Sequence, residues 1–187
     1  MRSANKKEWG NLRKKEQGFT ILEVAVSLFI ISMGVLGAMA LVDQTIRVKE
    51  VNKNKVIAGQ LAQEGVEIVR SIRDNNWLDE DDWHDGIING GAYTVHYNGG
   101  VVDTDVSGLS ASTTKLYLDP DGYYRHYDSP GSATSTIFRR IIKVDSSFDP
   151  STSASTSVES VVQWQERGTK HEYTAETVLY NWRRPSD

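Results

Sequence analysis

The densest cluster of potential metal ligands in the sequence lies in one short segment, residues 79–86, which reads DEDDWHDG. Carboxylate oxygens are the ligands that Ca²⁺ prefers, so this segment is a candidate site for a hard cation. The spacing does not fit an EF-hand loop, because Trp83 stands where that motif requires an acid. We therefore interpret the segment as a solvated acidic loop rather than as a metal site. Its candidate cation ligands, should the interpretation fail, are Asp79, Asp81, Asp82 and Asp85.

Other residue types with catalytic potential form no recognisable constellation. The chain has no cysteine, which excludes disulfides, thiolate metal sites and cysteine nucleophiles. Its four histidines are dispersed without an H-x-x-x-H pair, and no G-x-S-x-G, P-loop or dinucleotide-binding glycine pattern occurs. Asp119 and Asp121 alternate with Pro120 and Gly122, a combination typical of a turn. The sequence thus predicts neither an enzyme nor a bound cofactor.

One carboxylate occupies an unusual position. Glu23 directly precedes residues 24–42, which carry no formal charge. As a helix this stretch rises about 28 Å, close to the roughly 30 Å of a bilayer core. An ionised side chain deep in hydrocarbon costs on the order of 3 kcal/mol. Glu23 therefore either marks the membrane surface or requires a charged partner.

The charge distribution predicts how the apolar stretch is oriented across the membrane. Residues 1–18 carry a net charge of +4, which leaves −8 for the remainder of a chain whose total is −4. A basic leader before an apolar stretch predicts a single-pass protein of the cytoplasmic membrane, with its N-terminus in the cytoplasm and its C-terminal part outside. A cleaved secretory signal fits poorly, because its apolar region is usually about 7–15 residues long. The acidic body also argues against binding to nucleic acid.

Residues 14–23, KKEQGFTILE, carry a more specific pattern. The basic leader, Gly18, the aromatic Phe19 and an acid at the fifth position from Phe19 resemble the class III signal of type IV pilins and type II secretion pseudopilins. In that family a prepilin peptidase cuts after the glycine and methylates the new amine. The resemblance implies cleavage between Gly18 and Phe19, N-methylation of Phe19, and neutralisation of a neighbouring subunit's terminal amine by Glu23.

Two departures from the usual pattern favour a minor pilin or pseudopilin over a major subunit. The leader of 18 residues is longer than that of many type IVa pilins, and the apolar helix lacks the proline that many major pilins have. The segment LAQEGVEIVRSIRDN, residues 61–75, further resembles minor pilins described as pilus-modification proteins. Gly34 and Ala38 form a small-xxx-small pair that permits close helix contacts.

Beyond Val42 the chain continues with a helical period of a different kind. Apolar residues recur every three or four positions between residues 57 and 72, with polar side chains on the opposite face. We predict one helix from about Thr20 to Arg73, ending at Asn75 and Asn76. Its second half is expected to pack on a sheet. A strict heptad is not sustained, which argues against a coiled coil.

After Trp77, short alternating runs replace the helical period. Strands are predicted at residues 92–97, 101–106, 116–118, 123–124, 136–144, 158–164 and 173–180. Turns are expected at residues 98–100, 119–122 and 167–168, and a flexible loop at 146–156. The predicted fold class is α+β: a long N-terminal helix packed on a mainly antiparallel sheet, as in pilins. The predicted division is a cleaved leader (1–18), a membrane and filament half-helix (19–42), an amphipathic half-helix (43–76) and a β-rich head (77–187).

These features favour a structural filament subunit that carries out no chemistry of its own. The expected partners are prepilin peptidase, an inner-membrane assembly platform, other pilins or pseudopilins that contact the N-terminal helix, and membrane lipid before assembly. After assembly the protein is expected in a cell-surface or periplasmic filament. The alternative is a membrane-tethered binding module or adhesin that does not polymerise. The sequence does not separate a pilus from a secretion pseudopilus.

Overall fold

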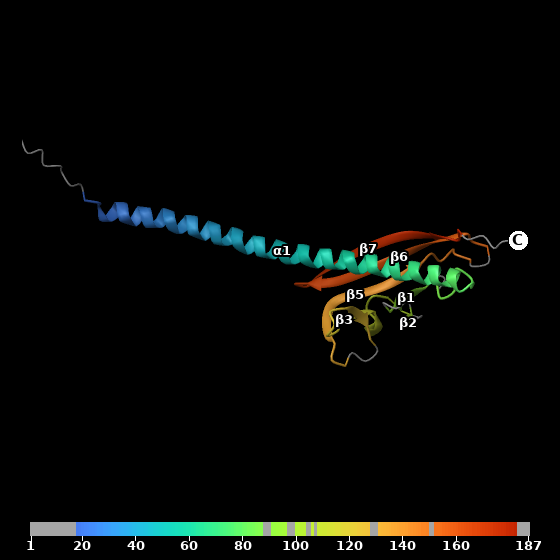
Figure 1. Cartoon of the computed structure of the whole chain (residues 1–187). Helices are drawn as coiled ribbons and strands as arrows, with labels where there is room; N and C mark the ends of the chain where they lie inside the picture. Colours follow the sequence, from blue (N-terminus) through green and yellow to red (C-terminus); the bar gives the residue numbers. More distant parts are fainter. Residues whose placement is uncertain are drawn as a thin grey trace, which may run out of the picture. The chain divides into compact units, whose positions relative to one another are not determined.

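The computed structural model describes residues 18–87, 91–96, 100–103, 106, 108–127, 131–149 and 152–182 (Figure 1). A single long α-helix, α1 (Ile21–Leu78), precedes seven strands in these residues. The strands are β1 (Ala92–Val95), β2 (Val101–Asp103), β3 (Lys115–Leu118), β4 (Tyr124–His126), β5 (Thr134–Val144), β6 (Ser155–Glu166) and β7 (Thr169–Tyr180). A 3-10 turn, η1 (Ser112–Thr114), leads into β3. The chain divides into two compact units, Met1–Arg47 and Val48–Asp187, and α1 continues from the first into the second.

The sheet of the second unit is organised around β5. β6 pairs along one edge of β5, while β3 and β1 pair in succession along the other edge, and all of these pairings are antiparallel. β7 pairs with β6 over its whole length, and β4 and β2 pair with β3 and β1. The β6–β7 hairpin turns at Arg167 and Gly168, whose φ values of 50° and 85° are typical of a two-residue turn that matches the strand twist.

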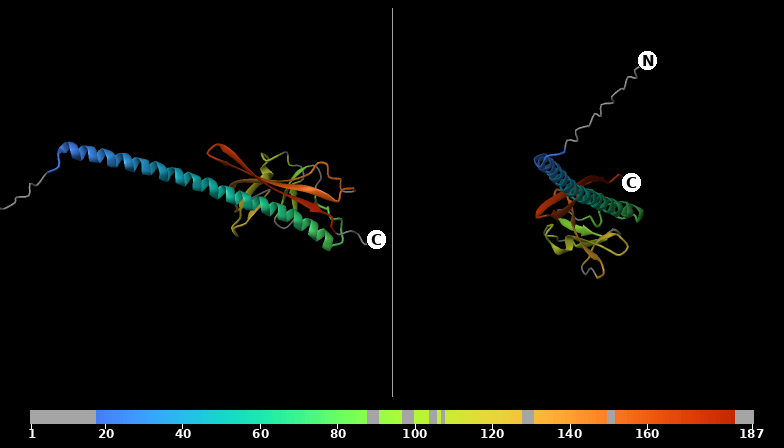
Figure 2. Two further views of the ribbon diagram at one scale, coloured as in Figure 1. Left: turned by 90° about the horizontal axis from the view of Figure 1, so that it is seen from above. Right: turned by 90° about the vertical axis from the view of Figure 1, so that its left-hand side faces the viewer.

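One face of this sheet is covered by the C-terminal part of α1, as Figure 2 shows. The buried residues of α1 lie at helical spacing and pack against alternate residues of β5, β6 and β7. These core residues of α1 are Ala58, Leu61, Ala62, Val66, Ile68, Val69, Ile72 and Trp77. On the opposite face, Ile141 and Val161 pack with Val106 beneath the segment that leads to η1. The α+β fold with an antiparallel sheet, predicted above, is thus confirmed.

α1 approaches the sheet most closely at Gly65. A Cβ atom there would overlap the hydroxyl of Ser160 and touch Cδ1 of Ile142. The buried Arg140 lies beneath the same turn of the helix and donates a hydrogen bond from Nη1 to the carbonyl oxygen of Leu61 (3.1 Å). The same Nη1 lies 3.6 Å from Oε1 of Glu64. A glycine is therefore required here by the close approach of the Ser160 and Ile142 side chains to the helix, and not by an unusual φ.

The predicted end of the helix was wrong by a few residues. α1 continues through Asn75 and Asn76 to Leu78, because tertiary contacts stabilise its last turn. Trp77 is buried edge-on against Trp182 with ring centroids 4.3 Å apart, and Arg73 lies over the Trp77 ring. Asn76 donates from Nδ2 to the carbonyl oxygen of Asp85 (2.8 Å), so it anchors the following loop.

The strand predictions agree with the structure in number and order and differ at their ends. β6 begins at Ser155, inside the predicted loop of residues 146–156, because β7 pairs with it as far as Ser155. The predicted first strand ends earlier, at Val95, and the second, at Asp103. Residue 97 of the first predicted strand, residues 98–99 of the first predicted turn and residues 104–105 of the second predicted strand lie outside the described residues, as does the leader before Gly18.

Candidate functional site

The N-terminal end of α1 brings together the residues of the predicted processing signal. Gly18, Phe19 and Thr20 are exposed and precede the helix, which begins at Ile21. Oγ1 of Thr20 accepts a hydrogen bond from the backbone N–H of Glu23 (3.2 Å), and its carbonyl oxygen accepts one from Val24 (3.2 Å). Thr20 is therefore the N-cap of α1, and the Gly18–Phe19 bond lies outside the helix in accessible chain.

Sequence reasoning missed the role of Thr20, although a signal for it was present. A Ser or Thr followed three residues later by Glu is a capping box, which marks helix N-termini. Thr20 and Glu23 have this spacing, and Glu23 is the acidic residue of the first turn of α1. The position favours a carboxylate, because unpaired N–H groups give a helix N-terminus a partial positive charge.

The helix that follows presents an apolar surface on all sides. The most apolar 18-residue window of α1 has a mean hydropathy of 2.4, and none of that window is buried. Ser32 and Thr45 turn their hydroxyls back to the carbonyl oxygens of Leu28 (2.7 Å) and Leu41 (2.8 Å), so these hydroxyls need no solvent. Space around Gly34 and Gly37 is open within 4 Å of where a Cβ would lie. By length and composition this helix is suited to cross a membrane.

Glu23 is the charged exception on this part of the helix. No ion pair joins its carboxylate to another residue in the described part of the chain. The favourable interaction with a helix N-terminus is typically about 0.3–1 kcal/mol at an exposed position. That is smaller than the several kcal/mol by which a buried, unpaired charge is penalised. In an apolar environment an ionised Glu23 therefore needs a full opposite charge.

The acidic loop has the geometry of a solvated cap and not of a chelating site. Its five carboxylates, those of Asp79, Glu80, Asp81, Asp82 and Asp85, are all on exposed residues. Within the described residues, no three His, Asp or Glu side chains come together as a metal site would require. The backbone of the loop is nevertheless held in place. Trp83 is buried against Phe148 (ring centroids 5.5 Å apart), and the N–H of Asp81 donates to the carbonyl oxygen of Asn76 (2.8 Å).

The aspartates near residue 120 serve the turn between β3 and β4. Oδ1 of Asp119 accepts hydrogen bonds from the backbone N–H groups of Asp121 and Tyr123, both at 3.0 Å. Oδ2 of Asp119 pairs with Nε of Arg125 at 2.8 Å. Gly122 has a φ of 90°, as the turn requires. Both carboxylate oxygens of Asp119 therefore have partners within this hairpin. The predicted turn is confirmed.

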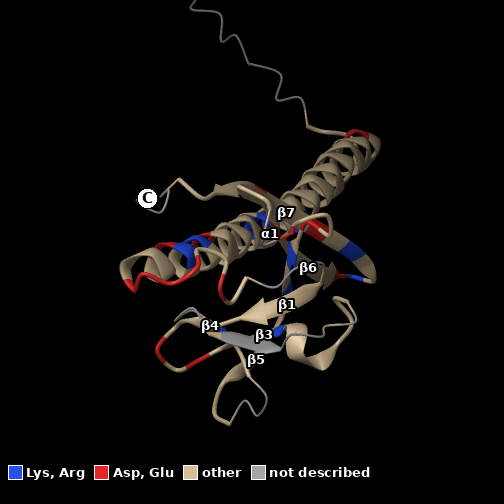
Figure 3. Ribbon diagram, turned by 90° about the vertical axis from the view of Figure 1, so that its right-hand side faces the viewer, with Lys and Arg blue, Asp and Glu red and all other residues tan. Residues whose placement is uncertain are grey.

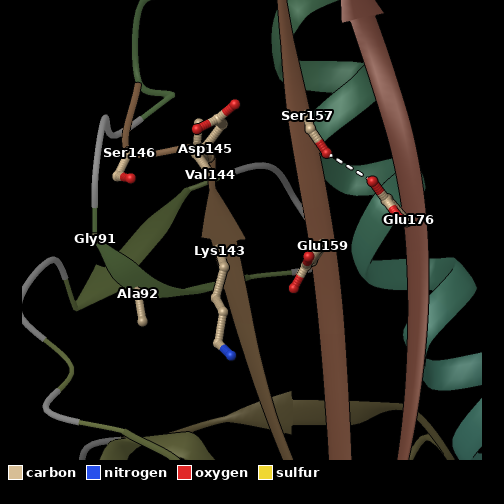
Figure 4. Close-up of a pocket in the computed structure, with 9 residues that line it drawn as sticks. All are labelled: Gly91, Ala92, Lys143, Val144, Asp145, Ser146, Ser157, Glu159 and Glu176. Atoms are coloured by element: carbon tan, nitrogen blue, oxygen red, sulfur yellow. Dashed lines mark hydrogen bonds between the residues drawn. The ribbon is translucent and has the colours of Figure 1, made fainter. Parts of the chain in front are cut away.

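A groove of about 640 Å³ lies on the sheet face away from α1, beside the ends of β5 and β6. Lys143, Glu159 and Glu176 line it, and the hydroxyl of Ser157 donates to Oε1 of Glu176 (2.9 Å), as Figure 4 shows. At its rim, Asp145 accepts hydrogen bonds from the N–H and hydroxyl of Ser147, which lower the pKa of its carboxyl. Among these lining residues there is no histidine that could act as a base toward Ser157.

Three titratable side chains of the second unit, those of Tyr93, His126 and Arg140, are buried in its interior. His126 is fully buried, and its Nδ1 lies 3.0 Å from the carbonyl oxygen of Thr113. Burial, together with the charge of Arg140, lowers the pKa of His126 to about 3. Burial also raises the pKa of the Tyr93 hydroxyl and lowers the pKa of Arg140, the latter opposed by Glu64. His126 is therefore neutral at physiological pH.

Comparison with known proteins identifies the N-terminal segment. Residues 13–39 match the family model of the prokaryotic N-terminal methylation motif. This is the signature of type IV pilins and pseudopilins, and it indicates a pilin-like precursor that is processed by prepilin peptidase. No curated protein and no solved structure matched the chain. The predicted family resemblance is thus confirmed, while the match assigns no subgroup.

Proposed function

We propose that this protein is a minor pilin or pseudopilin that enters, or initiates, a type IV pilus or a type II secretion-like filament. In this proposal the peptidase cuts between Gly18 and Phe19, and the new amine of Phe19 is methylated. The part of α1 up to Val42 first lies in the cytoplasmic membrane and then in the filament core. The β-rich head lies outside the membrane.

The observation that carries the proposal is Glu23, which has no ion-pair partner among the described residues and lies at the start of the exposed, apolar part of α1 within a methylation motif. Cleavage before Phe19 creates a cation one residue before the N-cap. There the partial positive charge of the helix N-terminus disfavours it. A carboxylate on a neighbouring subunit offsets this charge, and the same pair removes the penalty for burying Glu23. One ion pair between neighbouring subunits thus neutralises both the new amine of Phe19 and the carboxylate of Glu23.

Mass spectrometry of the membrane-bound protein tests the processing step. Cells with an active prepilin peptidase should contain a chain that begins at N-methylated Phe19. The matched variant Gly18→Val should retain Met1 and the leader, because a bulky branched side chain replaces the residue on the amino side of the scissile bond. A native protein that keeps its leader beside an active peptidase would instead indicate a membrane-tethered binding module.

Isolation of filaments tests the assembly step. The processed protein should sediment with sheared filaments and should be recovered with other pilins after cross-linking through α1. If the mature chain is found only in the membrane fraction of cells that make filaments, filament incorporation is contradicted while processing stands.

A further inference from the structure

A second groove on the sheet face away from α1 has an unusual charge. It has a volume of about 350 Å³ and is lined by three cationic side chains, those of Lys115, Arg139 and Lys170, with no Asp or Glu among its described lining residues. Lys115 lies opposite Arg139 across β3 and β5, and Arg139 lies opposite Gln163 across β5 and β6. The nearest acid in this register is Glu172, opposite Gln163 on β7. The groove is therefore positive on a protein whose exported part is strongly acidic.

The central cation of this groove is held in position by neutral groups. Nη1 of Arg139 donates to the carbonyl oxygens of Ala111 (2.7 Å) and Leu109 (3.4 Å) and to Oγ1 of Thr114 (3.2 Å). None of the ion pairs among the described residues involves Arg139, Lys115 or Lys170. An anion that enters the groove would thus meet preorganised positive charge without displacing a carboxylate.

The complementary surface on the same chain is the acidic loop, residues 79–85. Its carboxylates are exposed, and its backbone is fixed by Asn76 and by the buried Trp83. None of these carboxylates belongs to an ion pair within the described residues. Figure 3 shows this red segment directly after the C-terminal end of α1. Both surfaces therefore carry charged side chains that have no ion-pair partner among the described residues.

The two surfaces cannot meet within one molecule. The β6–β7 turn beside Lys170 lies next to the start of the packed part of α1, because Arg167 pairs with Glu50 (2.9 Å) and Glu166 accepts a hydrogen bond from Asn54 (3.2 Å). The acidic loop follows the other end of α1, after Leu78. At about 1.5 Å per residue, α1 separates these ends by roughly 40 Å. The acidic loop and the cationic groove can therefore pair with each other only between two molecules.

We propose that the acidic loop of one copy docks in the cationic groove of a second copy. Such a contact joins two different surfaces, so it is heterologous, and it repeats as an open, head-to-tail series when the rotation between copies does not close a ring. That geometry is the one that a filament needs, and the inference rests on the function proposed above. The contact lies between heads and adds to, without replacing, the contacts of the N-terminal helix. Its electrostatic character makes it sensitive to salt.

Site-directed cross-linking in the full-length protein tests the contact. The natural chain has no cysteine, so single cysteines give an unambiguous readout. Two differently tagged copies, one with Lys170→Cys and one with Asp82→Cys, should be joined by a short bis-maleimide in filament-producing cells. The matched pair Thr174→Cys with Asp82→Cys uses an exposed position on the same strand outside the groove. It should give at least fivefold less product.

Charge reversal provides the second measurement. Co-purification of two tagged full-length copies in detergent at low salt should fall at least fivefold when both carry Lys115→Glu and Lys170→Glu. It should recover when one of these copies is paired with a copy carrying Asp81→Lys and Asp82→Lys. Recovery requires opposite charges on the two surfaces, which general misfolding would not produce.

The results separate this inference from the proposed function. If filaments contain the processed chain but the two cysteine pairs cross-link equally, or the charge swap restores nothing, the head contact is overturned alone. The same holds if the charge reversal abolishes retention on a heparin column but leaves the cross-link unchanged, which would indicate an external polyanion as ligand. If the chain is never processed or incorporated, the proposed function fails instead.

Discussion

The packed part and the exposed apolar part of α1 differ in whether the charged side chains there have partners among the described residues. In the packed part, the buried Arg140 of β5 lies against the helix and finds its partners there, the carbonyl oxygen of Leu61 and the carboxylate of Glu64. In the exposed apolar part, the carboxylate of Glu23 forms no ion pair with the described residues. The first part is complete within one chain. The second has the chemistry of a surface that another molecule must complete.

The glycines of the helix show the same difference. A side chain at Gly65 would collide with Ser160 and Ile142, so this glycine serves contacts that already exist. Among the described residues, no atom outside the helix lies within 4 Å of where a Cβ would be at Gly34 or Gly37. Glycine in a helix interior costs roughly 1 kcal/mol relative to alanine. At Gly65 tight packing on the sheet offsets this cost, whereas at Gly34 and Gly37 nothing within the described chain does so.

Removing the charge of Glu23 should have the largest effect. Glu23→Gln should lower incorporation into filaments at least tenfold, because an unpaired amine in the filament core costs several kcal/mol and about 1.4 kcal/mol is a factor of ten. Quantitative immunoblotting of sheared filaments measures this. Membrane insertion should be unchanged, and the exposed control Asp121→Asn should assemble normally. Normal assembly of Glu23→Gln would show that the charge has no role there.

Removing the buried cation beneath α1 should chiefly affect stability. Arg140→Ala leaves a cavity and deprives Glu64 of its partner, and we expect a loss of about 3 kcal/mol in the free energy of unfolding. Chemical denaturation of the detergent-solubilised protein, followed by tryptophan fluorescence, measures it. Arg140→Met should be tolerated much better, because an apolar side chain of similar length replaces a desolvated charge. Equal losses in both variants would contradict this account.

A matched glycine pair sharpens the comparison of packing. Gly65→Ala should destabilise the protein by about 1–2 kcal/mol, since overpacking outweighs the better helix propensity of alanine. Gly37→Ala should not lower the stability of the head, as the added methyl group meets nothing in the described chain. Thermal unfolding of the two variants side by side gives the answer. Equal melting temperatures would show that the sheet yields easily at Ser160.

A change of pH should also alter stability, through His126. Its pKa is lowered to about 3 in the folded protein, against about 6.5 when unfolded. The unfolded chain therefore binds the extra proton between these values, and stability falls as pH decreases below about 6.5, by at most about 1.4 kcal/mol per pH unit. Denaturation curves at pH 7 and pH 5 measure the slope. His126→Gln should show a shallower slope, and an unchanged slope would assign the dependence to other groups.

Much of the architecture was predictable from local patterns. The turn at residues 119–122 follows from Asp119, Pro120 and Gly122, and the hairpin at residues 167–168 follows from a glycine between two alternating runs. The helix end was not predictable, because Asn75 and Asn76 are poor helix formers by themselves. Trp77 extends the helix through its contact with Trp182, more than one hundred residues away in a chain of 187.

The candidate site divides in the same manner. Gly18, Phe19 and Glu23 were predicted from their types and spacing within one short linear segment, which the methylation-motif match includes. The proposed head contact could not be found in that way. Lys115, Arg139 and Lys170 belong to three strands, and only their register places them on one face. Nor does any local pattern indicate that Arg140 lies beneath Leu61 and Glu64.

By itself the sequence determined the processing signal, the charge-free helix behind it and the α+β order of elements. These depend on neighbouring residues, on helical period and on turn chemistry, all of which are local. Only the tertiary structure decided which charges are satisfied within the chain and which remain exposed. Pairing of charges depends on distances between residues that are far apart in sequence, and those distances exist only once the sheet has formed beneath α1.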